Sequence, residues 1–155
     1  TLSDEFSSYV LPRVNSTLSE YCKNLLNLTQ DAIDTAKSFS VIAGDIAVFL
    51  NSYPPSRALV CSFGADCKKI NADALRHSVD DPFAQFERLD LRVEAARILG
   101  YNDQSIVREM VYRKLNLPDC VKRHDALYDA RDLVRIIDAL HNYLKSCQIG
   151  PTNRK

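Results

Sequence analysis

A histidine and an aspartate five positions apart, His124 and Asp129, are the residues of this chain best suited to chemistry. A neutral imidazole can take a proton from water, and a carboxylate can bind a divalent metal ion. Both residues lie where a loop is expected to lead into a long helix. One short segment would therefore supply both a base and a metal ligand. The pair therefore indicates metal-assisted hydrolysis. Alone it is a common spacing, because a histidine near a helix start is more often a capping or surface residue.

The composition is that of one ordinary globular domain without a global charge. Of the 155 residues 46% are hydrophobic, and 20 basic side chains balance 20 acidic ones. Binding of a polyanion therefore has to rest on a local basic patch or on a metal ion. Five cysteines without a Cys-x-x-Cys pair favour free thiols in a reducing, cytoplasmic compartment. The apolar runs are too short to span a bilayer, so we expect no membrane partner.

Strands and helices are expected to alternate along the chain. A strand over 5–11 ends at Pro12, and the apolar run 58–63 is typical of a buried parallel strand. Caps and hydrophobic periodicity predict helices between them. These helices are expected over 18–26, 29–36, 40–50, 66–76, 93–99, 105–115 and 125–145. The alternation predicts an α/β fold with a parallel component, in a single domain over residues 1–155.

Short motifs in this chain occur in a fixed order that is typical of one nuclease family. The motifs lie at 5–12, 18–22, 28–39, 62–66, 81–83 and 124–131. The ordered set resembles the DEDDh 3′–5′ exonucleases, in the branch of the histone-mRNA 3′-end and RNA-interference exonucleases. The resemblance covers nearly the whole chain. It implies a ribonuclease-H-like mixed sheet flanked by helices.

The resemblance also implies two divalent ions, Mg²⁺ or Mn²⁺, held by carboxylates around the scissile phosphate. It assigns Asp66 and Asp129 as metal ligands and His124 as the general base. The family's first motif, Asp-x-Glu on a central strand, is not found, because Asp4-Glu5 lacks the spacing. We therefore expect an N-terminally incomplete domain that lacks its first strands. A missing N-terminal segment or a second chain would complete the sheet.

The implied substrate is a single-stranded 3′ end of RNA or DNA, most plausibly RNA. Leu28 and Thr29 are expected near the terminal base, and Phe63 offers the aromatic face that the family presents with a tryptophan. A group of basic residues flanks the expected site and either steers phosphate or forms a solvated surface. This group is Lys68, Lys69, Arg76, Lys122 and Arg123.

Other interpretations remain open. A non-catalytic nucleic-acid-binding or scaffold module would keep the fold without the full metal chemistry. A soluble α/β domain that carries these motifs by chance is the third interpretation. Arg135 and His141 mimic a signature of small helical ribonucleases, but six residues at about 100° each put them about 120° apart on a helix. A zinc site made of cysteines and His124 lacks a usual ligand spacing.

Overall fold

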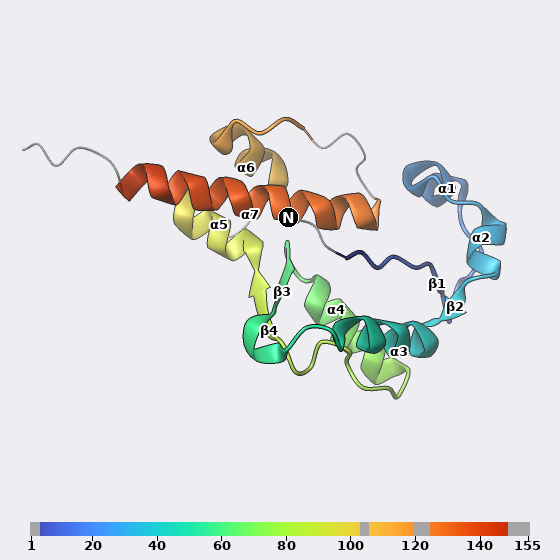
Figure 1. Ribbon diagram of the computed structural model, residues 1–155. Helices are drawn as coiled ribbons and strands as arrows, with labels where there is room; N and C mark the ends of the chain where they lie inside the picture. The colour runs from blue at the N-terminus through green and yellow to red at the C-terminus, as the bar shows by residue number, and fades with distance from the viewer. Residues whose placement is uncertain (1–3, 103–105, 120–124, 149–155) are drawn as a thin grey trace, which may run out of the picture.

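The computed structural model describes residues 4–102, 106–119 and 125–148 (Figure 1). In chain order, the elements are β1 (Val10–Leu11), α1 (Glu20–Leu26), α2 (Gln30–Asp34), β2 (Lys37–Ser38), α3 (Phe39–Leu50), the 3₁₀ helix η1 (Pro55–Arg57), β3 (Leu59–Ser62), α4 (Asp66–Arg76), β4 (Glu87–Asp90), α5 (Leu91–Leu99), α6 (Arg108–Leu115) and α7 (Ala126–Gln148). Within these ranges, no helix has both the length and the apolar character needed to cross a membrane.

The described strands form two separate parallel pairs, β1 with β2 and β3 with β4. In the second pair Leu59 lies opposite Glu87, and Ser62 lies opposite Asp90. The predicted α/β class with a parallel component is confirmed. The first strand is much shorter than the predicted 5–11, since only Val10 and Leu11 pair. Among the described strands, none pairs with the second edge of β3.

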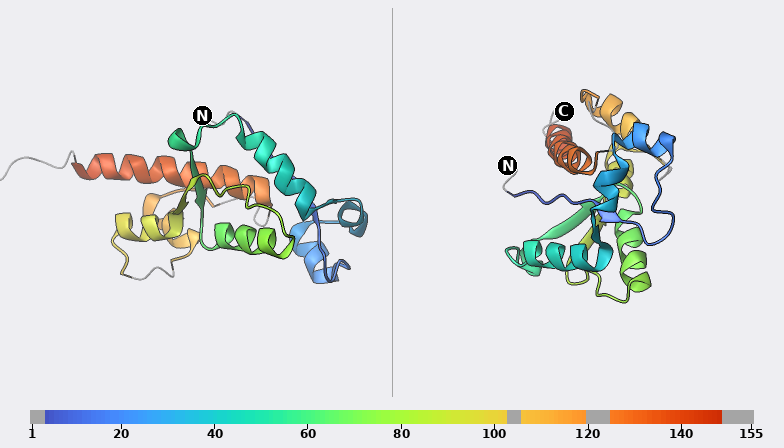
Figure 2. Two further views of the ribbon diagram at one scale, coloured as in Figure 1. Left: turned by 90° about the horizontal axis from the view of Figure 1, so that it is seen from below. Right: turned by 90° about the vertical axis from the view of Figure 1, so that its right-hand side faces the viewer.

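The longest helix, α7, runs along one side of the molecule, with α5 and α6 packed against it (Figures 1 and 2). The β3–β4 pair lies between this helical group and α3 with α4. The helices α1 and α2 lie at one end of the molecule, the end toward which the start of α7 points. The larger hydrophobic core is formed by α5, α6 and α7 together with Ile106.

Several predicted helix ends agree with the structure. Asn27 and Gly100 adopt the left-handed conformation that closes α1 and α5. Thr29 caps α2 by accepting a hydrogen bond from the Ala32 amide. The predicted helix 66–76 is found with the same bounds as α4.

The predicted starts of the first and the third helix were wrong, by two residues and by one residue. The first helix was expected to begin at Leu18, but Ser19 is its cap and accepts from the Cys22 amide. The Leu18 amide donates instead to the Gln30 side chain at 2.8 Å, which holds this residue outside the helix. The third helix begins after Ser38, because Ser38 is paired with β1 and the chain leaves the strand directly into α3.

The buried face of α7 also differs from the predicted stripe. We expected the residues Leu127, Ala130, Val134, Ile137, Leu140 and Leu144 to face inward. Leu140 is buried, but Ile137 and Leu144 are exposed, and the most deeply buried side chains of α7 are Ile136 and Asp132. Because Asp132 is charged, a hydrophobic pattern does not count it on the inner face. The predicted stripe instead lines two apolar depressions on the surface of the described structure.

Candidate functional site

One arginine connects two of the motifs that the sequence placed far apart. Arg108, the first residue of α6, donates from Nη1 to Oδ1 of Asp129 at 2.6 Å. Its guanidinium carbon also lies 5.5 Å from the centre of the Phe63 ring. Phe63 follows β3, and Asp129 lies in the first turn of α7. The structure therefore brings these two predicted site residues to the same place, beyond the C-terminal end of a parallel strand, where sites of α/β folds collect.

The segment between β3 and α4 is held in shape by hydrogen bonds between side chains and the backbone. Ser62 is buried and donates from Oγ to the Gly64 carbonyl at 3.0 Å. The Gly64 amide donates to Asp90 at 2.9 Å, and its φ of 104° lies in the region that favours glycine. Asp90 also caps α5 through the Arg92 amide. One carboxylate thus ties the end of β3 to the start of α5.

Asp66 lies at the start of α4, three residues after Phe63. The cap position of this helix is Ala65, and Asp66 is the first helical residue. Its side chain is 58% exposed and pairs with Lys69 at 3.1 Å. Lys69 and Arg76, two of the predicted basic residues, are engaged by carboxylates of their own helix. The Asp66 carboxylate faces solvent and is held only by a surface ion pair, which is typically weak.

Asp132 is a supporting residue that the sequence interpretation missed. Its side chain is 2% exposed, and it accepts hydrogen bonds from the Tyr112 hydroxyl of α6 and from Arg135 at 3.0 Å. Arg135 also donates to the carbonyl of Pro118 at 2.9 Å. These bonds fasten α7 to α6 one turn after Asp129. The signal in the sequence was a single aspartate at an otherwise apolar face of the helix.

The remaining predicted site residues are not joined to this place by the described contacts. The general-base candidate His124 lies outside the described residues, as do Lys122 and Arg123. Leu28 and Thr29 lie in the link between α1 and α2, and the Thr29 hydroxyl is used as the cap of α2. That link lies at the end of the molecule toward which the start of α7 points.

The donor chemistry suits a hard divalent cation, but the number of donors does not. Asp66 and Asp129 offer carboxylate oxygens, which Mg²⁺ and Mn²⁺ prefer. Within the ranges that the structure describes, however, no group of three or more His, Cys, Asp or Glu side chains is placed to hold a metal ion. Asp129 is also already paired with Arg108. The described residues supply part of a metal site and not a complete one.

An ion pair beside this site ties the N-terminal segment to α7. Arg131 donates from Nε and Nη2 to the two carboxylate oxygens of Glu5 at 2.5 and 2.6 Å. The hydrogen bond from Arg131 lowers the pKa of Glu5, and the same pair raises the pKa of Arg131. The Arg131 guanidinium also lies 5.3 Å from the centre of the Tyr128 ring. The chain near Glu5 therefore passes close to the first turns of α7.

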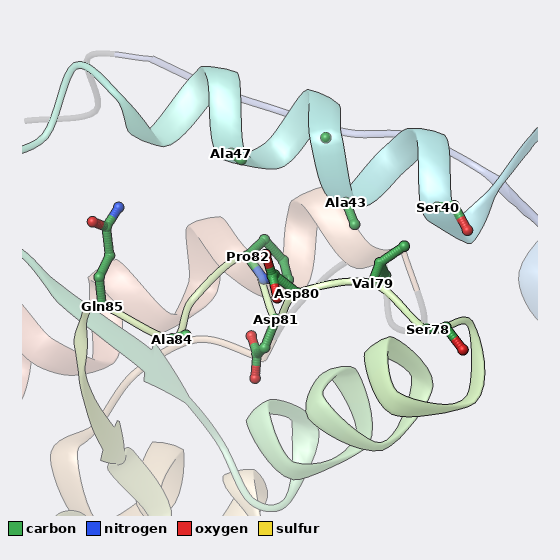
Figure 3. A pocket seen from close by; sticks show the side chains of 11 residues that line it. Ser40, Ala43, Ala47, Ser78, Val79, Asp80, Asp81, Pro82, Ala84 and Gln85 are labelled. Carbon is green, nitrogen blue, oxygen red and sulfur yellow. The ribbon is translucent and has the colours of Figure 1, made fainter.

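Another depression of the described structure lies elsewhere, between α3 and residues 78–85 (Figure 3). Its helical wall consists of the small residues Ser40, Ala43, Gly44 and Ala47. The Asp81 side chain points away from α3 and is engaged by Arg88 at 2.6 Å. None of the predicted site residues lines this depression. It is therefore not a candidate for the predicted chemistry.

Solved structures with the same fold define the class of this domain. The chain superposes on the nuclease domain of 3′hExo, a DEDDh family member bound to rAMP, with a TM-score of 0.78 and 21% identity, over 99% of this chain and 76% of that chain. It also matches a 3′-exonuclease that recognises the 3′ end of a histone mRNA stem-loop, with a TM-score of 0.77 and 20% identity, over 95% and 52% of the two chains. The fold is that of the ribonuclease-H-like exonuclease domains.

Sequence similarity narrows this class. One stretch is 42% identical over 53 residues to the 3′-5′ exonuclease eri1 of Schizosaccharomyces pombe, covering 34% of this chain and 18% of that protein. A second relative, 3′-5′ exoribonuclease 1 of Rattus norvegicus, is 39% identical over 51 residues, covering 33% and 15%. No protein-family model matches the chain. The matched stretch spans less than a fifth of the length of these relatives. Over this stretch the predicted resemblance to the DEDDh 3′–5′ exonucleases is confirmed.

Proposed function

We propose that the chain is the larger part of a 3′–5′ exonuclease domain that removes nucleotides from RNA 3′ ends. The observation that carries this proposal is the contact of Arg108 with both Phe63 and Asp129. It joins two motifs, 66 positions apart in the sequence (63 to 129), at one edge of an exonuclease fold. The relatives named as 3′-5′ exonuclease and exoribonuclease, and the neighbours bound to rAMP or to histone mRNA, support the choice of RNA.

Within this proposal, Asp66 and Asp129 are metal ligands, and His124 is the general base that takes a proton from the attacking water. Divalent Mg²⁺ or Mn²⁺, when bound, supplies charge stabilisation to both the attacking and the leaving oxygen. Phe63 stacks on a base near the 3′ end, since an aromatic face accepts any base. Leu28 and Thr29 approach the terminal nucleotide from the α1–α2 link.

We further propose that another strand completes the sheet beside β3 and carries the remaining carboxylates. A strand edge with open backbone groups is a template for pairing. The depression between the β3–β4 pair, α5 and α7 is also lined by apolar side chains that are half-buried or exposed, as expected for a face that still lacks a layer. They are Leu59, Cys61, Leu89, Ile137 and Leu144. A preceding segment of the same protein or a second chain would supply this strand.

We also propose a domain organisation and a cellular compartment for the protein. Residues 1–155 form one exonuclease domain that is incomplete at its N-terminus. The described cysteines Cys22, Cys61, Cys67 and Cys147 are free thiols. Free thiols, one of them exposed, suit a reducing cytoplasmic environment.

A trimming assay tests the proposed activity. A 5′-labelled single-stranded oligoribonucleotide and its DNA counterpart are incubated with a longer chain that also contains the proposed upstream strand, in Mg²⁺, Mn²⁺ or EDTA, and the products are separated on a sequencing gel. We expect a ladder that shortens from the 3′ end, requires metal, and falls by about 100-fold or more in Asp129→Asn. Asp138→Asn, an exposed aspartate on the same helix, is the matched control and should be unchanged.

The second candidate function is a nucleic-acid-binding module without catalysis. The pairing of Asp129 with Arg108 favours it, because a carboxylate held by a guanidinium is not available to a metal. The same assay separates the two functions. If a longer chain that contains an upstream Asp-x-Glu binds the oligonucleotide but never shortens it, the exonuclease proposal is wrong.

A further inference from the structure

Two arginines approach the segment that follows β3, and the proposed chemistry uses neither. Arg108 comes from the start of α6 and lies over the Phe63 ring. Arg92 comes from the first turn of α5, and its guanidinium carbon lies 4.0 Å from the point that a Cβ on Gly64 would occupy. Consecutive residues of one loop thus contact guanidinium groups from two different helices.

Arg92 has hydrogen-bonding capacity that the described protein does not use. Its Nε is buried and has no hydrogen-bond partner. Its Nη2 reaches Oδ2 of Asp90 only at 3.4 Å, while Oδ1 of Asp90 already accepts from the amides of Gly64 and Arg92. A buried donor without a partner is costly, and such groups in native proteins are usually satisfied by a ligand, an ion or water.

Gly64 is the loop residue near this guanidinium, and a Cβ at its position would lie 4.0 Å from the central carbon of the guanidinium. A residue with a side chain is strained at the φ of 104° found here, so the loop geometry favours glycine. A planar guanidinium with free donors suits the oxygens of a phosphate better than any neutral group does.

We propose that Arg92 and Arg108 form a phosphate-binding subsite for the nucleic-acid backbone, on either side of the Phe63–Gly64 segment. This inference rests on the proposed function, since it names the groups that hold the strand whose end is cut. Arg92, whose side chain is 36% exposed, donates to a phosphate oxygen from its guanidinium. Arg108 exchanges the Asp129 carboxylate for a phosphate of the strand while it stays over Phe63. The binding requires no metal ion.

Fluorescence anisotropy with a labelled single-stranded oligoribonucleotide in EDTA tests the subsite apart from catalysis. We expect Arg92→Gln and Arg108→Gln each to weaken binding about tenfold and to reduce the slope of log K against log salt by about 0.7. Arg92→Lys should restore only part of the loss, since lysine lacks the planar fork. Arg97→Gln is the matched control, because Arg97 is exposed on α5 and paired with Glu94 at 2.7 Å.

The outcomes separate this inference from the proposed function. Circular dichroism establishes that each variant is folded. If the parent protein binds and both variants bind like Arg97→Gln, the subsite is wrong and the exonuclease proposal stands. If the parent protein shows no binding in EDTA, the subsite is also overturned, and the trimming assay with metal alone decides the exonuclease proposal.

Discussion

The C-terminal helices and the N-terminal elements of this chain are packed to different degrees. In α5, α6 and α7, Ala95, Val111 and Ile136 are completely buried, and the buried charge of Asp132 is satisfied by neighbours. In α1, no residue is buried, and the second core cluster consists of only Phe39, Ala43 and Ala74. The C-terminal group can therefore hold Asp129 in place by its own packing. The N-terminal group cannot position its residues equally well without a further layer.

The strands explain this difference. The pair β1–β2 has two residues on each strand and packs against α2 and α3. A two-stranded pair is marginal on its own and gains stability when more strands share its face. Within the described residues the β3–β4 pair is likewise two-stranded, and half-exposed apolar residues line the depression between it, α5 and α7. The candidate-site residue on the C-terminal helices is thus held by packing, whereas the residues on the N-terminal elements are positioned less well.

The largest expected effect concerns stability in the two regions. Ile136→Ala should lower the free energy of unfolding by about 3 to 4 kcal/mol, since it leaves a cavity in the α5–α6–α7 core. Leu26→Ala, in the half-exposed end of α1, should cost less than about 1 kcal/mol. Urea unfolding followed by circular dichroism measures both. Equal losses would show that the N-terminal elements are packed as tightly as the C-terminal helices.

A second prediction concerns the reactivity of Cys61 on β3. Burial, with a smaller contribution from Cys67, raises the pKa of the Cys61 thiol. Its thiolate forms only at higher pH, so at pH 8 iodoacetamide should modify Cys61 about tenfold more slowly than the exposed Cys147. Mass spectrometry of digested protein gives both rates, and the difference should narrow as pH rises.

The reactivity of Cys61 also tests whether a further strand lies beside β3. In a longer chain that supplies a strand beside β3, Cys61 should become still less reactive, while Cys147 should keep its rate. Unchanged reactivity of Cys61 in a longer, folded chain would mean that the additional segment packs elsewhere.

The smallest expected effect is that of the exposed pair between Glu5 and Arg131. Because the pKa of Glu5 is lowered in the folded chain, the pair contributes above the ordinary pKa of 4.5 and is lost as pH falls through the lowered value. A carboxyl titration by NMR should place the midpoint of Glu5 below 4.5 and return it to that value in Arg131→Gln. A midpoint of 4.5 in the parent chain would show that the N-terminal segment is not tethered to α7.

Local signals predicted much of the fold, and tertiary contacts account for the rest. Asn27, Thr29 and Gly100 act through their own backbone or the next turn, so their positions could be identified from the sequence. The start of α1 depends on Gln30, which takes the Leu18 amide across 12 residues. The inner face of α7 depends on Asp132 and its partner Tyr112. Neither contact has a periodic pattern in the sequence.

The residues of the candidate site likewise divide into those that local motifs predict and those that depend on tertiary contacts. Phe63 and Asp129 could be predicted because they stand in motifs with fixed spacing, and the structure brings them to one arginine. Arg108 itself could not be predicted, since it lies outside every motif and acts only through the fold. The unpaired Nε of Arg92 and its position near Gly64 likewise could not be predicted, because both depend on the folded structure.

The central claim is that Asp66 and Asp129 belong to one metal-binding site, and paramagnetic Mn²⁺ tests it most directly. In ¹⁵N-labelled protein, the amide signals around both residues should broaden over the same range of Mn²⁺ concentration, because one bound ion relaxes both. Asp129→Asn should weaken the broadening around Asp66 as well, whereas Asp138→Asn should leave it unchanged. Separate titrations at the two residues, or broadening around Asp66 that survives Asp129→Asn, would contradict the account.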